Sequence, residues 1–416
     1  MKIFLIADYF YPYNPGGTEW SVYELAKAFK KSSIDSTVIT LNYGSKQEEI
    51  YHGIKIIRLP FFKKLKDKRA VVNPIWQNNL LFFLTSAYYL FKIIKSENPE
   101  IIHVHGKFLI PAAIISGFIS KKPVIVTIRD KQIICPIGKC FFDQKRFKSC
   151  NFWEFLISDF PWFIKNYTNK KPFVIAHIFI GVIWSRFAGE IIKFFAKRAI
   201  QITTISNSQK KYLEANGFKN VKVIYNTADF KISKVIIPKI KSVLFVGKLS
   251  KGKGVELLLD AAESLLKNNK IKFLFAGQVQ SLKIKNRLKQ KPLKSSSTLL
   301  GSVDYNDLPG IYRKVSVLAM PSIYPESFGR AALESLSNGT PVVVTDVGAL
   351  SEIVEDKITG RVVPTAMDSL KEAILDVLKN EKQYKKNIAK NYEKLRDKFN
   401  TNPIYDYVKL YKEYTK

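Results

Sequence analysis

Short runs of β-branched and aromatic residues alternate with longer segments of helical periodicity through most of this chain. The first series of such runs covers residues 2–10, 36–42, 54–60, 101–106 and 123–130. This alternation predicts a parallel sheet with helices on both faces. The pattern restarts after residue 226, with strand-like runs at 242–249 and 271–279 around a helical segment at 254–268. Two successive series predict an α/β chain with two Rossmann-like domains facing one cleft.

The length of the chain and one irregular segment indicate where the two domains divide. A chain of 416 residues is too long for one core and divides most naturally into two domains of ordinary size. The segment 228–242 is irregular and interrupted by proline, which is typical of a link. We therefore expect a first domain over 1–227 and a second over 228–394.

The opening residues and the cysteines bear on compartment and metal binding. The first run is apolar for about six residues before Asp8, which is shorter than the core of a secretory signal. We interpret it as a first strand and expect a cytoplasmic protein. The three cysteines, Cys135, Cys140 and Cys150, do not make a disulfide framework, and structural zinc normally has four ligands. With no Asp-x-Asp sequence to hold a divalent ion, we expect neither a metal nor a cofactor.

The charge balance predicts an anionic partner. The chain has 67 Lys and Arg against 35 Asp and Glu, a net charge of +32, which suits nucleic acid, anionic lipid or a phosphorylated substrate. The segment 61–70 sets two phenylalanines beside a basic cluster, as membrane-surface segments do. The apolar runs at 80–91 and 173–184 are shorter than the roughly 18 residues of a membrane span. Buried helices and a solvated basic face explain these segments equally well, and the hypothesis favoured here is peripheral association with the inner membrane face.

Two turns after predicted strands carry residues suited to phosphate. Gly16 and Gly17 precede a helix, whose N-terminal amides attract anions, although a glycine pair there can equally be a simple tight turn. Lys248 and Lys253 follow the first strand of the second series, where two ammonium groups can neutralise a diphosphate. Solvated lysines are the alternative in a lysine-rich chain.

A third turn has two glutamates around a glycine. Gly329 allows a sharp turn, so that the backbone amides of residues 327–330 can act as anion donors; these residues are Ser327, Phe328, Gly329 and Arg330. Glu326 precedes the turn and Glu334 lies in the following helix, and carboxylates are acceptors suited to the vicinal hydroxyls of a sugar and a ribose. A helix-start residue and a solvated helix residue are the alternative reading of the pair.

Taken together, these segments resemble one enzyme family. Glu326 and Glu334 match an E-x7-E motif, and the turn with Lys248 and Lys253 matches a Gly-Arg/Lys…Lys-Gly turn. Further matches are the hinge VIYNTADF, the approach GSVDYNDLPGIYRKVSVLAMPS and the loop PGGTE. In these residues the chain resembles the retaining, nucleotide-sugar-dependent glycosyltransferases of family 4, which have the GT-B fold of two Rossmann-like domains. The resemblance is most specific over 243–364 and weaker over 140–200.

The resemblance implies a donor site in the second domain. Lys248 and Lys253 would hold the diphosphate, with help from the amides of Phe328 and Gly329. Lys248 stands where many members have arginine, so the charge is kept and a bidentate grip is lost. Glu326 would bind hydroxyls of the transferred sugar.

The remaining family roles fall on other parts of the chain. Glu334 would bind the ribose hydroxyls, and Gly16 and Gly17 would let the N-terminal loop approach the diphosphate. A C-terminal helix over 395–416 would pack back onto the first domain.

The reaction implied is hexosyl transfer from a nucleoside diphosphate sugar, such as a UDP-sugar, to an acceptor hydroxyl with retention of configuration. No covalent nucleophile stands out, so the departing phosphate would assist deprotonation of the acceptor, and leaving-group stabilisation would be the main catalytic effect. A lipid-linked or cell-surface glycan precursor is the expected acceptor.

One position departs from the family. Members of the family usually have a histidine at the end of the strand that corresponds to the run at 123–130. Arg129 stands at that position here, and arginine does not accept a proton at neutral pH. Arg129 could still hydrogen-bond the sugar or steady developing charge. Asp130 is a candidate base or arginine partner, and His105 is the nearest imidazole to be named, although a structural histidine is the simpler reading.

Three other classes of function compete with sugar transfer. A sugar-nucleotide epimerase or a phosphorylase shares the GT-B fold. A basic nucleic-acid-binding protein fits the charge, but the basic residues are dispersed and no recognition motif appears. A dehydrogenase would need the dinucleotide fingerprint, which is absent.

Overall fold

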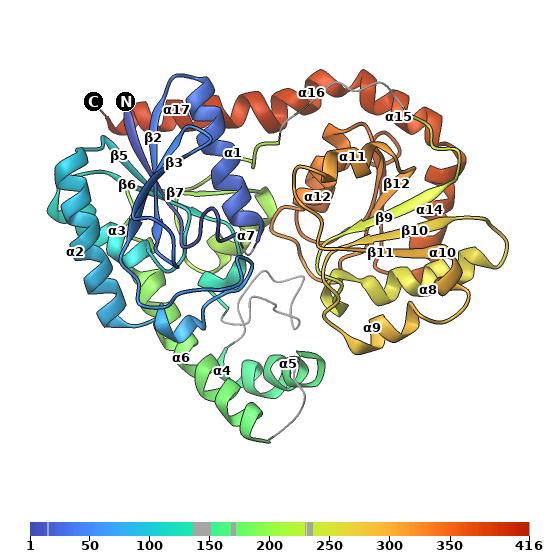
Figure 1. The fold of residues 1–416 in the computed structure, drawn as a ribbon, viewed down its shortest axis with the longest axis horizontal. Helices are drawn as coiled ribbons and strands as arrows, with labels where there is room; N and C mark the ends of the chain where they lie inside the picture. The colour runs from blue at the N-terminus through green and yellow to red at the C-terminus, as the bar shows by residue number, and fades with distance from the viewer. Residues whose placement is uncertain (15, 136–150, 168–171, 229, 231–235, 416) are drawn as a thin grey trace. The chain divides into compact units, whose positions relative to one another are not determined.

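The computed structural model describes residues 1–14, 16–135, 151–167, 172–228, 230 and 236–415. The chain divides into two units, Met1–Thr227 with Asn402–Lys416, and Ala228–Thr401 (Figure 1). The return to the first unit therefore begins at Asn402 rather than at residue 395. Each unit is built on its own sheet, so the two units are described separately.

The first unit has an eight-stranded sheet in the order β3-β4-β2-β1-β5-β6-β7-β8. All neighbouring strands are parallel except β3 and β4, which form an antiparallel pair. The strands are β1 Lys2–Ile6, β2 Asp35–Leu41, β3 Glu48–Tyr51, β4 Ile54–Leu59, β5 Ile101–Val104, β6 Val124–Ile128, β7 Gln201–Thr204 and β8 Val221–Val223. The predicted strands are all present, whereas β3, β7 and β8 had not been predicted.

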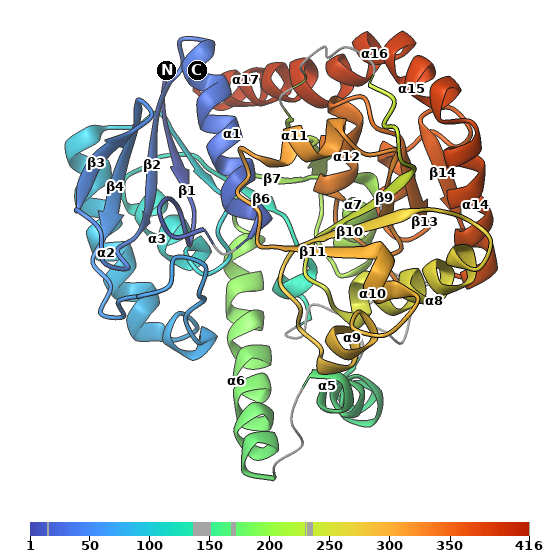
Figure 2. The same cartoon turned by 45° about the vertical axis from the view of Figure 1, so that its right-hand side comes forward.

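Helices cover both faces of this sheet (Figures 1 and 2). They are α1 Gly17–Lys31, η1 Pro74–Trp76, α2 Leu80–Glu97, α3 Ile110–Ile119, η2 Lys131–Ile133, α4 Phe152–Glu154, the π-helical η3 Phe155–Asp159, α5 Phe160–Tyr167, α6 Pro172–Ala196, α7 Asn207–Ala215 and α17 Asn402–Tyr414. One core cluster contains side chains of α2 and α3, and a second contains those of α1 and α17. Within the described ranges, no helix combines the length and apolarity needed to cross a membrane.

The C-terminal helix α17 completes one face of the first unit. The rings of Phe29 and Tyr411 meet edge to face, with centroids 5.9 Å apart. The hydroxyl of Tyr411 also lies 2.5 Å from Nδ1 of the buried His103 on β5. These contacts tie the end of the chain to α1 and β5.

The second unit has a six-stranded, fully parallel sheet in the order β11-β10-β9-β12-β13-β14. Its strands are β9 Ser242–Val246, β10 Lys272–Ala276, β11 Ser297–Gly301, β12 Val317–Met320, β13 Val342–Thr345 and β14 Gly360–Val363. Its helices are η4 Lys251–Lys253, α8 Val255–Leu266, α9 Leu282–Arg287, α10 Leu293–Ser296, α11 Leu308–Arg313, α12 Arg330–Ser337, α13 Leu350–Ile353, α14 Met367–Lys379, α15 Glu381–Lys390, α16 Tyr392–Arg396 and the π-helical η5 Asp397–Thr401. Its main core joins α8 and α14 to the sheet.

Each sheet has a point where the strand order changes direction. In the first unit β1 has β2 on one side and β5 on the other, and in the second unit β9 lies between β10 and β12. Loops that leave the carboxyl ends of two such neighbouring strands diverge, and ligands bind between them in open α/β sheets. The loops after β1 and β5, and those after β9 and β12, are therefore where functional side chains should meet.

Candidate active site

The loop after β9 carries the two lysines predicted to bind phosphate. Lys248 is exposed, whereas Lys253 is partly buried at the end of η4. Gly254 follows in the left-handed conformation, with φ of 69°, and begins α8. The positive φ suits glycine because it has no Cβ. The loop therefore presents Lys253 at a fixed position and leaves Lys248 in solvent.

The loop after β12 brings Glu326 to Lys253. The ammonium nitrogen of Lys253 lies 2.6 Å from Oε1 and 2.8 Å from Oε2 of Glu326. The hydroxyl of Ser322 donates to Oε1 of the same carboxylate at 2.5 Å. Two residues predicted to act on the donor are thus in direct contact within the second unit.

Close backbone packing holds these two loops together. A Cβ on Gly254 would lie 1.6 Å from the carbonyl oxygen of Pro321, and one on Gly252 would overlap the ring of Tyr324. The amide of Ile323 donates to the carbonyl of Gly252 at 3.2 Å. The loop after β12 can lie this close to η4 because both facing residues are glycines.

A third loop fixes the backbone around Glu326. The amide of Ala349 donates to the carbonyl oxygen of Glu326 at 2.9 Å. A Cβ on Gly348 would lie 2.2 Å from that same oxygen. Gly329, with φ of 98°, ends the turn and caps α12. Ser327 and Phe328 lie within this turn, and the side chain of Phe328 is buried.

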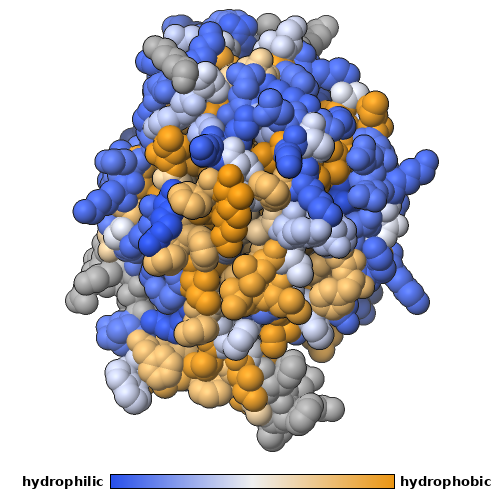
Figure 3. Space-filling view, turned by 90° about the vertical axis from the view of Figure 1, so that its left-hand side faces the viewer, coloured by the Kyte–Doolittle hydropathy of each residue, from blue (hydrophilic) through white to orange (hydrophobic). Residues whose placement is uncertain are grey.

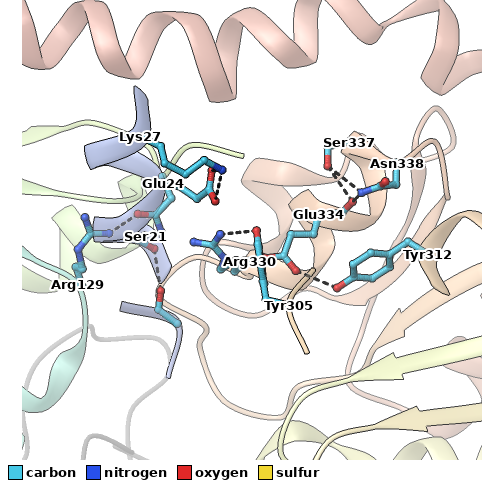
Figure 4. A network of polar contacts seen from close by, with 12 residues as sticks. Ser21, Glu24, Lys27, Arg129, Tyr305, Tyr312, Arg330, Glu334, Ser337 and Asn338 are labelled. Carbon is cyan, nitrogen blue, oxygen red and sulfur yellow. Dashed lines mark hydrogen bonds and ion pairs between the residues drawn. The ribbon is translucent and has the colours of Figure 1, made fainter. Parts of the chain in front are cut away.

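Glu334 is buried on α12 and already has two partners (Figure 4). Oε1 accepts from Nε of Arg330, one turn earlier, at 2.6 Å, and Oε2 accepts from the hydroxyl of Tyr312 at 3.1 Å. Arg330 also donates to the hydroxyl of Tyr305 at 2.7 Å. Burial, followed by the charge of Glu334, raises the pKa of Tyr312 well above its usual value. The hydroxyl therefore stays protonated and donates a hydrogen bond to the carboxylate. A carboxylate can accept about four hydrogen bonds, so capacity remains for ribose hydroxyls.

In the first unit, Asp8 follows β1 directly. Its carboxylate accepts hydrogen bonds from the amides of Phe108 and Leu109, each at 3.1 Å, just before α3. Burial raises the pKa of Asp8 to about 6, although the two amides and Lys107 act in the opposite direction. The sequence prediction had missed this residue.

The predicted glycine loop leads to a second buried carboxyl. Gly16 is the N-cap of α1 and Gly17 its first residue, and both are exposed. Glu19 lies in the first turn, and burial raises its pKa to about 7. Among the described residues, Oε2 of Glu19 has no hydrogen-bond partner. Its position in the helix alone does not reveal this burial.

Arg129 is held by His105 and Asn226. Its Nη2 lies 2.9 Å from Nδ1 of His105, and Nη1 donates to Oδ1 of Asn226. Because a guanidinium has no acceptor, Nδ1 of His105 must accept, which places the imidazole proton on Nε2. Burial, then His103 and Arg129, lower the pKa of His105 well below its usual value. His105 is therefore neutral, and its lone pair is occupied by the arginine.

Asp130 is exposed, whereas the preceding residue, Arg129, is buried. The side chain of Asp130 accepts from the amide of Gln132 at 2.8 Å, which caps η2. Arg129 donates to His105 and Asn226. The second unit thus pairs Lys253 with Glu326 and Arg330 with Glu334, and leaves Lys248 exposed. The first unit pairs Arg129 with His105 and leaves Asp130 exposed.

The cysteines and possible metal ligands were the remaining candidates for a site. Cys135 is buried, and Cys140 and Cys150 lie outside the described residues. Across the described ranges, no group of three or more His, Cys, Asp or Glu side chains could hold a metal ion.

Two family models match the chain, one in each unit. Residues 227–394 match the model of the glycosyl transferases group 1, and residues 15–132 match that of glycosyltransferase family 4. The first range includes Lys248, Lys253, Glu326 and Glu334, and the second includes Gly16, His105 and Arg129.

Several curated relatives and solved structures resemble this chain, some over nearly its whole length and others over a part of it. An uncharacterized glycosyltransferase of Methanocaldococcus jannaschii is 27% identical over 96% of this chain and 94% of its own length. A phosphatidyl-myo-inositol mannosyltransferase of Mycobacterium leprae is 28% identical over 38% of this chain and 42% of its own. An Anabaena protein crystallised with UDP and glucose covers 98% of both chains, with a TM-score of 0.67 at 18% identity. The chain is therefore an enzyme, a glycosyltransferase with the GT-B fold.

Proposed function

We propose that this enzyme moves a hexose from a nucleoside diphosphate sugar to an acceptor hydroxyl with retention of configuration and without a metal ion. The observation that carries the proposal is the pairing of Lys253 with Glu326 beside the turn at Gly329. A cation for phosphate, a carboxylate for sugar hydroxyls and the backbone amides of a tight turn are then available on two packed loops of the second unit.

The ion pair suits an exchange of partners when donor binds. Without donor, Glu326 neutralises Lys253. A diphosphate would draw the ammonium toward its oxygens, and the carboxylate would then be free to accept hydroxyl groups of the sugar. Lys248, which is exposed, would add a second positive charge, and the amides of Phe328 and Gly329 would complete the cradle. Glu334, held by Arg330 and Tyr312, would accept the ribose hydroxyls.

Neither His105, which follows β5, nor Arg129, which follows β6, suits the role of a side-chain base. Arg129 cannot accept a proton, and the lone pair of His105 is engaged by Arg129. We therefore propose that the departing phosphate takes the acceptor proton on the same face as the leaving group. The bond from the anomeric carbon to the phosphate oxygen breaks while the new glycosidic bond forms, and the proton passes to the phosphate. The role left to Arg129 is electrostatic.

UDP is the favoured nucleotide and a lipid-linked or cell-surface glycan precursor the favoured acceptor. The Anabaena protein with the same fold was crystallised with UDP and glucose. One partial relative is named for an acceptor that carries lipid, phosphatidyl-myo-inositol. These relatives support the proposal without identifying the sugar or the linkage.

A two-step experiment tests the function. A thermal-shift screen over nucleoside diphosphate sugars first identifies the donor, because a ligand that binds only the folded state raises Tm. Labelled donor and candidate acceptors then give product, whose anomeric configuration is read by NMR. Transfer with retention, undiminished by EDTA, is expected. Inverted product, loss with EDTA, conversion of the donor to an epimer, or phosphorolysis without nucleotide would refute the proposal.

A further inference from the structure

Helix α2 is apolar on both sides. Its buried stripe, which includes Phe83, Leu90 and Ile94, packs into the core of the first unit. A second, exposed stripe is formed by Leu80, Leu81, Leu84 and Tyr88, of which Leu81 is the most exposed, at 73%. The spacing of three and four residues places these side chains on one side of the helix. A helix packed on one side of a core normally presents polar residues to water.

Neighbouring elements extend the apolar stripe into a surface. We define the α2 face as Phe62, Trp76, Leu80, Leu81, Leu84 and Tyr88, all of which are exposed. The ring of Phe62 contacts that of Trp76, which ends η1 just before the helix. On the adjacent α3, Phe118 is 85% exposed. Figure 3 shows hydrophobic residues gathered over this side of the first unit, with hydrophilic residues around them. Apolar surface of this extent on a soluble protein indicates an interaction site.

The charges beside this surface are positive. The ammonium nitrogen of Lys63 lies 4.7 Å from the ring centroid of Trp76, and that of Lys92 lies 4.4 Å from the ring centroid of Tyr88. From residue 61 to residue 96 the chain has seven Lys and Arg residues and one Asp. The next acid, Glu97, is already paired with Lys2 and Lys55. The apolar surface is therefore bordered by cations.

We propose that the α2 face docks on the surface of an anionic lipid bilayer. Its leucines and aromatic rings would enter the boundary between headgroups and acyl chains, while Lys63 and Lys92 would lie at the level of the lipid phosphates. A second copy of this chain suits the surface less well, because a symmetric contact would bring the two sets of basic residues together. The proposal does not rest on the donor chemistry, since vesicle binding is measured without nucleotide.

Vesicle binding by the full chain tests the proposal. Sucrose-loaded vesicles of phosphatidylglycerol and phosphatidylethanolamine are sedimented with the protein, alongside vesicles of phosphatidylcholine alone. We expect binding to the anionic vesicles that weakens as salt rises, and much weaker binding to phosphatidylcholine. The double change Leu81→Ser and Leu84→Ser should weaken binding about tenfold. The pair Lys63→Gln and Lys92→Gln should weaken it at low salt and flatten the salt dependence.

A matched control separates this face from general surface hydrophobicity. Leu282 on α9 of the second unit is 79% exposed, as accessible as Leu81. Leu282→Ser should leave vesicle binding unchanged, and all variants should keep the wild-type Tm because the side chains are exposed. Equal binding by wild type and the α2-face variants, or equal binding to both kinds of vesicle, would overturn the proposal. So would conversion of a dimer to a monomer by the leucine variant with no change in vesicle binding.

Discussion

The ammonium nitrogen of Lys253 lies 2.6 and 2.8 Å from the two carboxylate oxygens of Glu326, although 73 positions separate these residues. The side chain of Lys253 is still 32% exposed. The side chain of Glu326 is 13% exposed, so the pair is open to water mainly on the lysine side and contributes about 1 kcal/mol to stability. Both residues can therefore be changed without unfolding the protein, and a loss of activity would report on function.

The first prediction concerns this pair. Lys253→Ala and Glu326→Gln should each reduce sugar transfer by about 100-fold or more, because each removes a contact that serves the leaving group or the sugar. Initial rates with the donor found by thermal shift measure the effect, with circular dichroism as the check on folding. Lys251→Ala is the matched control, since Lys251 is an exposed lysine of the same turn. Wild-type rates in the Lys253 and Glu326 variants would disprove the site.

The second prediction separates binding from stability around Glu334. Glu334→Ala should weaken affinity for the nucleoside diphosphate, since the acceptor for the ribose hydroxyls is lost. Tyr312→Phe keeps the carboxylate but removes its hydrogen bond at 3.1 Å, so it should lower the free energy of unfolding by about 1 kcal/mol. Calorimetric titration with nucleotide and urea unfolding measure the two effects. Loss of nucleotide affinity in Tyr312→Phe as large as in Glu334→Ala would contradict this division.

The strand and helix alternation and the two donor-side loops could be predicted because each depends on local pattern. Hydrophobic runs mark strands such as β1 and β9, and glycine with charge marks the turns after them. β7, with the sequence QITT, was not predicted because it has only four residues and a single apolar side chain, so no hydrophobic run marks it. Its side chains are nevertheless buried, because side chains of a strand point to the two faces of the sheet and helices cover both faces of a parallel sheet.

Partners that lie far apart in sequence could not be predicted. Glu334 has a visible partner one turn away in Arg330, but its second partner, Tyr312, comes from α11. Asp8 lies directly after the first strand, at the edge of the sheet where ligands bind, and this signal could have identified it. The burial of Glu19 depends on the whole first unit and leaves no local mark in the sequence.

The third prediction concerns Arg129, which stands where a histidine was expected. Arg129→Ala removes a cation beside His105, so the pKa of His105 should rise while remaining below its usual value, because burial is the larger cause. The chain has four histidines, so the imidazole signals can be followed by NMR during titration. The variant should also lose about 2 kcal/mol of stability, because Nδ1 of His105 and Oδ1 of Asn226 lose their donor. An unchanged titration of His105 would show that Arg129 does not set its charge.

The fourth prediction is a pH dependence from the buried carboxyls. Asp8 and Glu19 have pKa values raised to about 6 and about 7. Their folded forms hold protons more tightly than the unfolded chain, so the stability that they contribute is complete at low pH and is lost as pH rises through these values. Between pH 6.5 and pH 8 the loss should be about 1 kcal/mol, mostly from Glu19.

Tryptophan fluorescence during urea unfolding measures this change in the first unit alone, because all five tryptophans lie within residues 1–227. His103 and His105 act in the opposite direction, because their pKa values are lowered while the unfolded chain still binds protons near pH 6.5, so the effect of Glu19 is read as a difference between wild type and a variant. Glu19→Gln removes the ionising group, so between pH 6.5 and pH 8 wild type should lose about 0.8 kcal/mol more stability than this variant. The same slope in this variant and in wild type would assign the effect to other groups.

The last prediction compares two glycines that share a backbone conformation. Gly254 and Gly301 have φ of 69° and 65°. A Cβ on Gly254 would lie 1.6 Å from the carbonyl oxygen of Pro321, whereas one on Gly301 meets nothing within 4 Å. Both alanine substitutions bear the conformational strain of about 1–2 kcal/mol. Only Gly254→Ala must also push the loop after β12 away from η4, which would separate Lys253 from Glu326. It should therefore abolish the donor-induced rise in Tm, while Gly301→Ala lowers Tm and keeps that rise. If both variants respond to donor alike, the close approach of the two loops is not what sets the site.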